Sequence, residues 1–135
     1  MLTMIRRQFT IDEASGYLAW LEECFSIIDR TTNSLENVLL TIEEIKSKGR
    51  TNGYSAIDTK MKKAEEDEKR LRSDLEETIR SINDENIIIR DIKLGLVDFP
   101  SVLDGEEVFL CWKRGEHSIQ FWHKTDQGFG SRRPL

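Results

Sequence analysis

Residues 110–123, LCWKRGEHSIQFWH, contain several of the side chains in this chain that are best able to take part in catalysis or metal binding. Cys111, Glu116 and His123 are residue types that can act as nucleophile, acid–base group or metal ligand. The candidate ligand or polar-site residues of the whole chain are Asp98, Cys111, Glu116, His123, Asp126 and Arg132. Their types allow several chemistries, so the sequence assigns no catalytic residue, cofactor or metal.

Which of these side chains face one another depends on how the strands in this stretch pair. A two- or four-residue turn pairs Leu110 with Phe121 and places Cys111 and His123 on opposite faces. A three- or five-residue turn shifts the pairing by one residue and places Cys111, Phe121 and His123 on one face. The first register gives the core Val108, Leu110, Trp112, Ile119 and Phe121. We therefore favour it, and in it a Cys–His nucleophilic pair is not expected.

A metal site would need three or four converging ligands, and none of the candidates falls at a recognised metal-binding spacing. A hydrogen-bonded structural polar cluster is the simpler expectation, because buried polar groups must find partners. Asp98 lies between apolar residues and is expected to have a partner, which Arg132 or Arg133 of the closing tail could supply. Such a pair could tie down the tail or line a pocket for an anion. We expect Trp112 and Trp122 to be packing residues.

The elements that would hold this stretch begin with two helices. Thr10 and Glu13 form the pattern of a capping box, which predicts a helix start. Apolar residues then recur in alternating steps of three and four, and a second apolar column runs beside them. At about 1.5 Å per residue, this helix would exceed 50 Å. The segment 47–54, with Gly49, Asn52 and Gly53, predicts its end and a turn.

A second helix fits residues 55–84, with charged residues of both signs on its solvated face. The apolar face of the first helix is wider than one partner helix covers. We therefore expect an antiparallel helical hairpin with a coiled-coil-like seam that forms a homodimer through this hairpin.

The apolar period changes to two after Asn83, which predicts strands. We expect an α+β fold in a single domain of residues 1–135. Its parts are a helical hairpin at 10–84, an antiparallel β-meander of three to four strands at 85–124, and an irregular tail at 125–135. Pro100 should close one strand, and residues 103–107 and 114–117 should form turns.

Composition limits the class of protein. The chain has 135 residues, of which 38% are hydrophobic and 33% charged, and this balance is typical of long solvated helices. The net charge of −5 argues against nucleic acid as the general partner. Two distant cysteines suggest buried thiols in a reducing compartment rather than a disulfide framework. No signal peptide or membrane span is recognisable, so a soluble cytoplasmic protein is expected.

The C-terminal third closely resembles the signature of an uncharacterised prokaryotic family, domain of unknown function 2203. The matching positions are Gly95–Pro100, Leu110–Trp112, Gly115–Glu116, Trp122–His123, Gly128–Phe129, Arg132 and Pro134–Leu135, with Phe9–Ala14 similar to the family's start. Departures such as His117 in place of a common proline occur at turns and leave the candidate residues intact. The resemblance implies no activity.

These observations leave two hypotheses. The first is a non-enzymatic, homodimeric interaction module, to which a protein partner could bind. The alternative is a small metal- or ligand-binding protein or enzyme with a polar site at the β-meander and tail. The second requires the candidate side chains to converge at a concave surface.

Overall fold

The structure is a computed structural model, and it describes residues 7–49 and 55–135. The described helices are α1 (Ile11–Ser15), α2 (Leu18–Gly49) and α3 (Ser55–Asp84). The elements that follow are β1 (Ile88–Asp91), β2 (Leu96–Leu103), β3 (Glu106–Lys113), β4 (Phe121–Lys124), the 3-10 helix η1 (Phe129–Ser131) and β5 (Arg133–Pro134). The predicted α+β class, with a helical hairpin before an antiparallel sheet, is therefore confirmed.

The chain forms two compact units. The sheet unit consists of Met1–Phe25 and Arg80–Leu135, and the hairpin unit is Ser26–Ile79. Both long helices, α2 and α3, contribute residues to each unit. The described helices include none long and apolar enough to cross a membrane.

The first helix begins as predicted but is interrupted early. The Thr10 side chain accepts a hydrogen bond from the Glu13 amide, and the Glu13 carboxylate accepts one from the Thr10 amide, so the predicted capping box is confirmed. These hydrogen bonds lower the pKa of the Glu13 carboxyl. The helix then stops at Ser15, because the chain makes a turn at Gly16 and Tyr17 before α2 starts.

The helix predicted at residues 55–84 is α3, and it has the predicted bounds, Ser55–Asp84. It carries ion pairs at helical spacing on its solvated face, including Lys63–Asp67 and Arg72–Glu68. The end of the first long helix is at Gly49, as its sequence indicates, whereas the predicted turn residues Asn52 and Gly53 lie outside the described residues.

The sheet is an antiparallel meander with the strand order β1-β2-β3-β4-β5. It therefore has more strands than the three to four expected, because residues 133–134 of the tail pair with β4. The tail was predicted to be irregular, but it contains this short strand and the 3-10 helix η1.

Pro100 does not close β2, which corrects the expectation from sequence. It lies inside the strand opposite Phe109, beyond the part of β2 that pairs with β1. Its carbonyl accepts a hydrogen bond from the Phe9 amide at 2.7 Å, and Ser101 Oγ donates to the Phe9 carbonyl. The N-terminal segment thus takes the place of a neighbouring strand where the proline has no N–H to offer.

The register of β3 and β4 is the one that the sequence analysis did not favour. Leu110 pairs with Trp122, and Cys111 pairs with Phe121. The cause is the long connection between Lys113 and Phe121, which is not a tight turn. It is held by the indole of Trp112, which donates to the Glu116 carbonyl at 2.7 Å.

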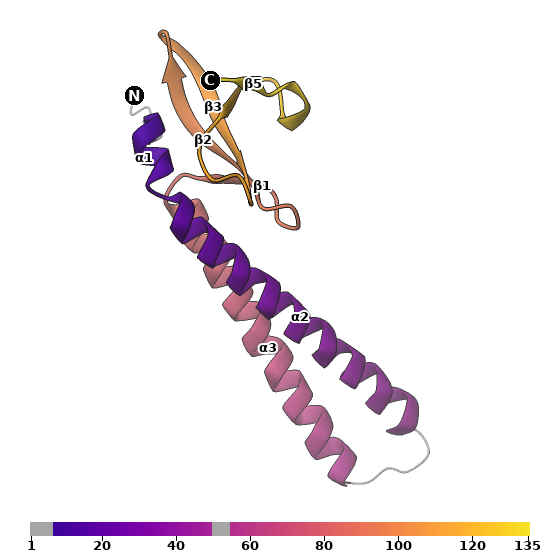
Figure 1. The fold of residues 1–135 in the computed structure, drawn as a ribbon. Coiled ribbons are helices and arrows are strands. Elements are labelled where there is room, and N and C mark those ends of the chain that lie inside the picture. The colour runs from indigo at the N-terminus through magenta and orange to yellow at the C-terminus, as the bar shows by residue number, and fades with distance from the viewer. Residues whose placement is uncertain (1–6, 50–54) are drawn as a thin grey trace, which may run out of the picture. The chain divides into compact units, whose positions relative to one another are not determined.

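The two faces of the sheet have different contents. One face carries the apolar core, in which Val97, Phe99, Val108, Leu110 and Trp112 are almost fully buried. Phe9 packs edge-on against Phe99 on this side. The opposite face carries Asp98, Cys111 and His123, and Figure 1 shows α1 and the C-terminal tail at opposite sides of the sheet.

Candidate functional site

A row of paired residues across the sheet brings several predicted site residues together. Asp98 of β2 lies opposite Cys111 of β3, which lies opposite Phe121 of β4. His123 follows Phe121 by two residues, so it points to the same face of the sheet. The shift in register therefore places Cys111 and His123 together, contrary to expectation.

Asp98 has two side-chain partners, and neither is the tail arginine that the sequence suggested. Arg90 Nε donates to Oδ2 at 2.8 Å, and His123 Nε2 lies 3.0 Å from Oδ1. The Asp98 side chain is only 2% exposed. A buried carboxylate of this kind is stable only with such partners.

Both ring nitrogens of His123 have hydrogen-bond partners. Its Nδ1 lies 2.8 Å from the Lys124 carbonyl oxygen, which can only accept, so Nδ1 is the donor of that bond. Its Nε2 lies 3.0 Å from Oδ1 of Asp98, whose other oxygen accepts from Arg90. The pair of His123 and Asp98 is therefore held from both ends, by the backbone at Lys124 and by Arg90.

Cys111 lies beside this pair as a protonated thiol. Burial raises the pKa of the Cys111 thiol to about 12, and the charge of Asp98 adds to the rise while Arg132 opposes it. Because the thiolate is the reactive form, Cys111 is not an activated nucleophile.

Arg132 connects the C-terminal tail to the same face. Its Nη1 donates to both carboxylate oxygens of Glu116 at 3.0 Å. Its guanidinium also lies over the rings of Phe121 and Phe129, at 4.2 and 4.1 Å from their centroids. Glu116 in turn accepts from the Lys113 amide at 2.8 Å, so the tail, the long connection and β3 are joined at one point.

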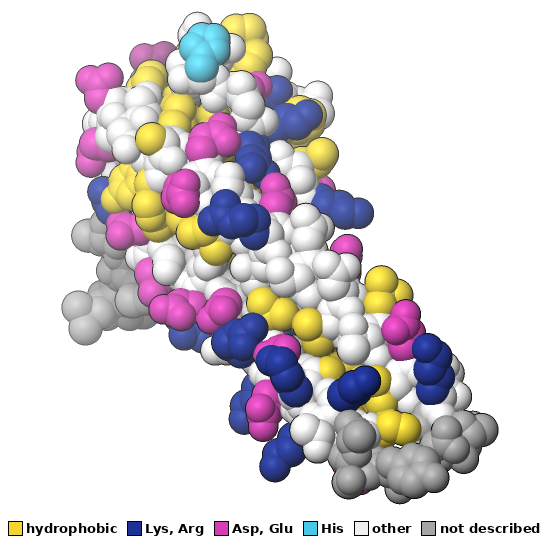
Figure 2. Space-filling model, turned by 60° about the horizontal axis from the view of Figure 1, so that its bottom comes forward, with side chains coloured by type: hydrophobic (Ala, Val, Ile, Leu, Met, Phe, Trp, Pro, Cys, Tyr) yellow, Lys and Arg dark blue, Asp and Glu magenta, His cyan; other side chains and the backbone are white. Residues whose placement is uncertain are grey.

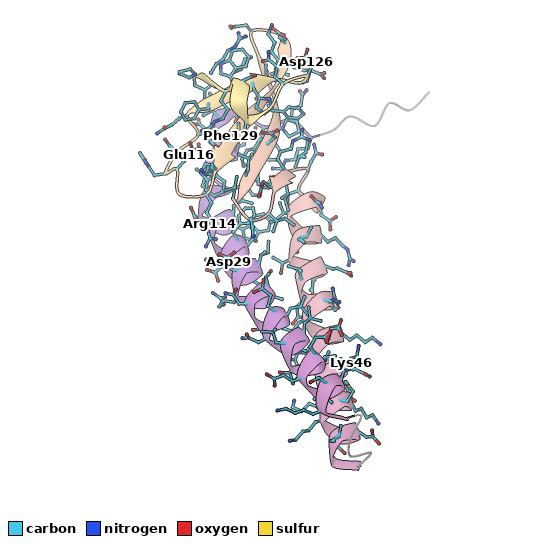
Figure 3. The ribbon with its side chains drawn as sticks, turned by 90° about the vertical axis from the view of Figure 1, so that its right-hand side faces the viewer. Asp29, Lys46, Arg114, Glu116, Asp126 and Phe129 are labelled. Atoms are coloured by element: carbon cyan, nitrogen blue, oxygen red, sulfur yellow. The ribbon has the colours of Figure 1, made fainter. Side chains whose placement is uncertain are left out.

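Asp126 is the one predicted candidate that the structure places apart from these residues. It is exposed in the turn after β4. Figure 3 shows it well separated from Glu116 and Phe129. The sequence analysis also missed Arg90. A signal was available, since an arginine at an alternate position of the run Ile87–Ile92 should share a face with a neighbouring strand's carboxylate.

The arrangement restricts what this site can do. Among the described residues, every buried side-chain nitrogen and oxygen has a hydrogen-bond partner. Both nitrogens of His123 are engaged, and its side chain is 1% exposed. Asp98, Cys111 and His123 nevertheless offer one oxygen, one sulfur and one nitrogen within 4.8 Å of one another. The site thus resembles a closed structural cluster with the donor set of a metal centre, rather than an open catalytic cleft.

Fold and site together define a small α+β protein in which a long helical hairpin precedes an antiparallel sheet with a buried polar cluster. The sequence profile of a family described as an uncharacterised conserved protein (DUF2203) matches residues 7–135. The chain belongs to this family, and the match extends the resemblance of the C-terminal third to nearly the whole chain. Searches of curated proteins and of solved structures gave no match.

Proposed function

We propose that the protein is a non-enzymatic interaction module that forms a homodimer through its hairpin unit. The observation that carries this proposal is an apolar surface along the hairpin that the two helices do not cover. The polar cluster of the sheet unit supports the non-enzymatic part, because its central side chains are closed to a substrate.

The helices of the hairpin unit bury only part of their apolar stripes. Ile28, Leu35 and Ile42 of α2 are buried. Further apolar residues of the two helices are only half-buried: Val38 and Ile45 of α2, and Ile57, Met61, Leu71, Leu75 and Ile79 of α3. Two helices alone leave one side of each stripe in water, and a further helical layer would bury it.

A groove of about 600 Å³ lies between α2 and α3 within the hairpin unit. Its apolar lining consists of Val38, Ile45, Ile57 and Ala64. Figure 2 shows an interrupted row of hydrophobic side chains along the hairpin, bordered by charged ones. An apolar groove with a charged border is the usual form of a surface that receives a helix.

A second copy of the hairpin fits this groove best. The charged residues of the lining have both signs, with Glu44 and Asp67 beside Lys60 and Lys63. In a two-fold symmetric contact the same surface meets itself, so a patch with both signs can form ion pairs with its own copy. The apolar residues of the second copy would also cover the apolar lining of the groove.

Sedimentation velocity with matched charge substitutions tests this proposal. We expect the wild-type protein to be a dimer at micromolar concentration. Ile45→Glu, in the groove, should shift it to monomer because it buries a charge at the contact. Leu40→Glu is the control, since Leu40 is on the same helix, 63% exposed and outside the groove lining. A wild-type monomer, or dissociation by Leu40→Glu but not by Ile45→Glu, would contradict the proposal.

A further inference from the structure

We propose that Asp98, Cys111 and His123 form a binding site for a borderline divalent transition-metal ion, with Zn²⁺ as the best match. This site belongs to the sheet unit and does not depend on the proposed dimer. The ligands would be Oδ1 of Asp98, Sγ of Cys111 and Nε2 of His123.

The distances among the three donor atoms are close to those of a metal centre. All of them lie within 4.8 Å of one another, and the Asp98 and His123 atoms are 3.0 Å apart. Ordinary zinc bond lengths in a tetrahedron put such donors about 3.3–3.6 Å apart. Side-chain movements of roughly 1 Å, small against the reach of a χ rotation, would therefore complete the site.

The surroundings of the ligands already have the form of an outer shell. The Nδ1 proton of His123 is donated to the Lys124 carbonyl, which leaves Nε2 as the nitrogen that faces the other two ligands. Metal-binding histidines typically donate their second nitrogen in this way. Arg90 holds the other oxygen of Asp98 and so fixes the carboxylate with Oδ1 towards His123.

A divalent ion would balance the charges of its own ligands. Asp98 would bind as a carboxylate, His123 through a neutral imidazole nitrogen, and Cys111 as a thiolate whose proton goes to solvent. Each ligand atom would donate an electron pair, and no oxidation state changes. The ion and its three ligands would then carry no net charge beside Arg90 and Arg132.

The donor set selects the kind of ion. Thiolate and imidazole favour Zn²⁺ and related ions over Mg²⁺ and Ca²⁺, which prefer oxygen. Three protein ligands leave a coordination position for a water molecule. Because Asp98 and His123 are at most 2% exposed, that position would be closed to larger molecules. The ion would therefore fasten β2, β3 and β4 together rather than catalyse a reaction.

Cobalt titration of the full chain tests the site, because the sequence supplies a matched control for two of the ligands. The chain has two cysteines and two histidines. We expect one Co²⁺ per chain with a thiolate-to-cobalt charge-transfer band in the wild type, Cys24→Ala and His117→Gln. Cys111→Ala should lose the band, and His123→Gln should bind at least about 100-fold more weakly. Zn²⁺ should displace the cobalt, whereas Mg²⁺ should not.

X-ray absorption of the zinc-loaded wild-type protein keeps the test decisive if a variant fails to fold. The expected spectrum has one sulfur at about 2.3 Å and nitrogen or oxygen ligands at about 2.0–2.2 Å. The proposal would be overturned by a folded wild-type protein that binds neither ion stoichiometrically, or by a zinc shell without sulfur. A cobalt band that persists in folded Cys111→Ala, or one that disappears in Cys24→Ala, would also overturn it.

Discussion

The sheet unit and the hairpin unit differ in how far the residues of a single chain bury their apolar side chains and pair their polar groups. The sheet unit has a core of large buried apolar side chains, and the polar groups that enter this core have partners, although residues at its surface such as Ile92, Leu94 and Phe129 are exposed. In the hairpin unit several apolar residues are only half-buried, and Val38, Ile45 and Ile57 among them line the groove. Composition alone therefore does not identify the proposed interaction surface: the aromatic-rich sheet encloses its polar cluster, whereas the highly charged helices are the ones that form an apolar groove.

Among the substitutions proposed here, Asp98→Ala is expected to destabilise the sheet unit most. It leaves His123 buried without its carboxylate, so we expect a loss of about 3–5 kcal/mol in the free energy of unfolding. Urea unfolding measures it. The exposed Asp126→Ala is the control and should change stability by no more than about 0.5 kcal/mol. Equal effects of the two substitutions would show that the buried pair does not hold the sheet.

High pH should weaken the sheet unit through Cys111. The folded protein keeps the thiol proton up to a pKa of about 12, whereas an unfolded thiol loses it near the ordinary value of about 9. The folded state thus binds more protons between these values, and its stability falls as pH rises through them. The stability of the wild type minus that of Cys111→Ala should fall by on the order of 4 kcal/mol across this window. Urea unfolding curves that stay parallel for the two proteins would contradict this assignment.

Arg132→Gln should release the C-terminal tail. The guanidinium bonds to Glu116 and lies against two aromatic rings, so its loss should cost roughly 2 kcal/mol. Hydrogen exchange should speed up at the Leu135 amide, which donates to Gln120. Arg133→Gln, at an exposed position over Trp122, is the matched control and should have a much smaller effect. Similar exchange in both variants would mean that Arg132 does not anchor the tail.

The smallest expected effects come from the same valine-to-alanine substitution made once in each unit. Val108 is 1% exposed in the sheet unit, and Val38 is half-exposed in the groove. Val108→Ala should cost about 2 kcal/mol at any protein concentration. Val38→Ala should cost less than about 1 kcal/mol in dilute protein, with a larger cost as concentration rises and the dimer forms. Unfolding curves at two concentrations measure both, and a concentration-independent cost at Val38 would count against the dimer.

Much of the fold could be predicted from local pattern. The bounds of α3 and the capping box at Thr10 follow from apolar period and cap chemistry, which act over a few residues. Pro100 was misjudged because its tolerance depends on whether a neighbouring strand reaches it, which is a property of the tertiary fold. The interruption after Ser15 likewise has no strong signal in the apolar pattern.

The sequence singled out Asp98, Cys111 and His123 but not their arrangement, and it did not single out Arg90. The register of β3 and β4 follows from the long connection at 114–120, which contacts between Trp112 and Glu116 stabilise. No rule for short hairpins covers such a connection. Since a shift of one residue moves every side chain to the other face, this error separated Cys111 from His123. The partners of Asp98 were also assigned wrongly, because Arg90 is supplied by a strand whose pairing was not known.

Hydrogen exchange at two protein concentrations tests the central contrast most directly. If the hairpin unit is completed by a second copy, protection of its amides within residues 26–49 and 57–79 should rise with concentration. Protection of β2 and β3 against local opening should stay constant, because the sheet unit is complete in one chain. Hairpin protection that does not depend on concentration across the micromolar range would contradict this account.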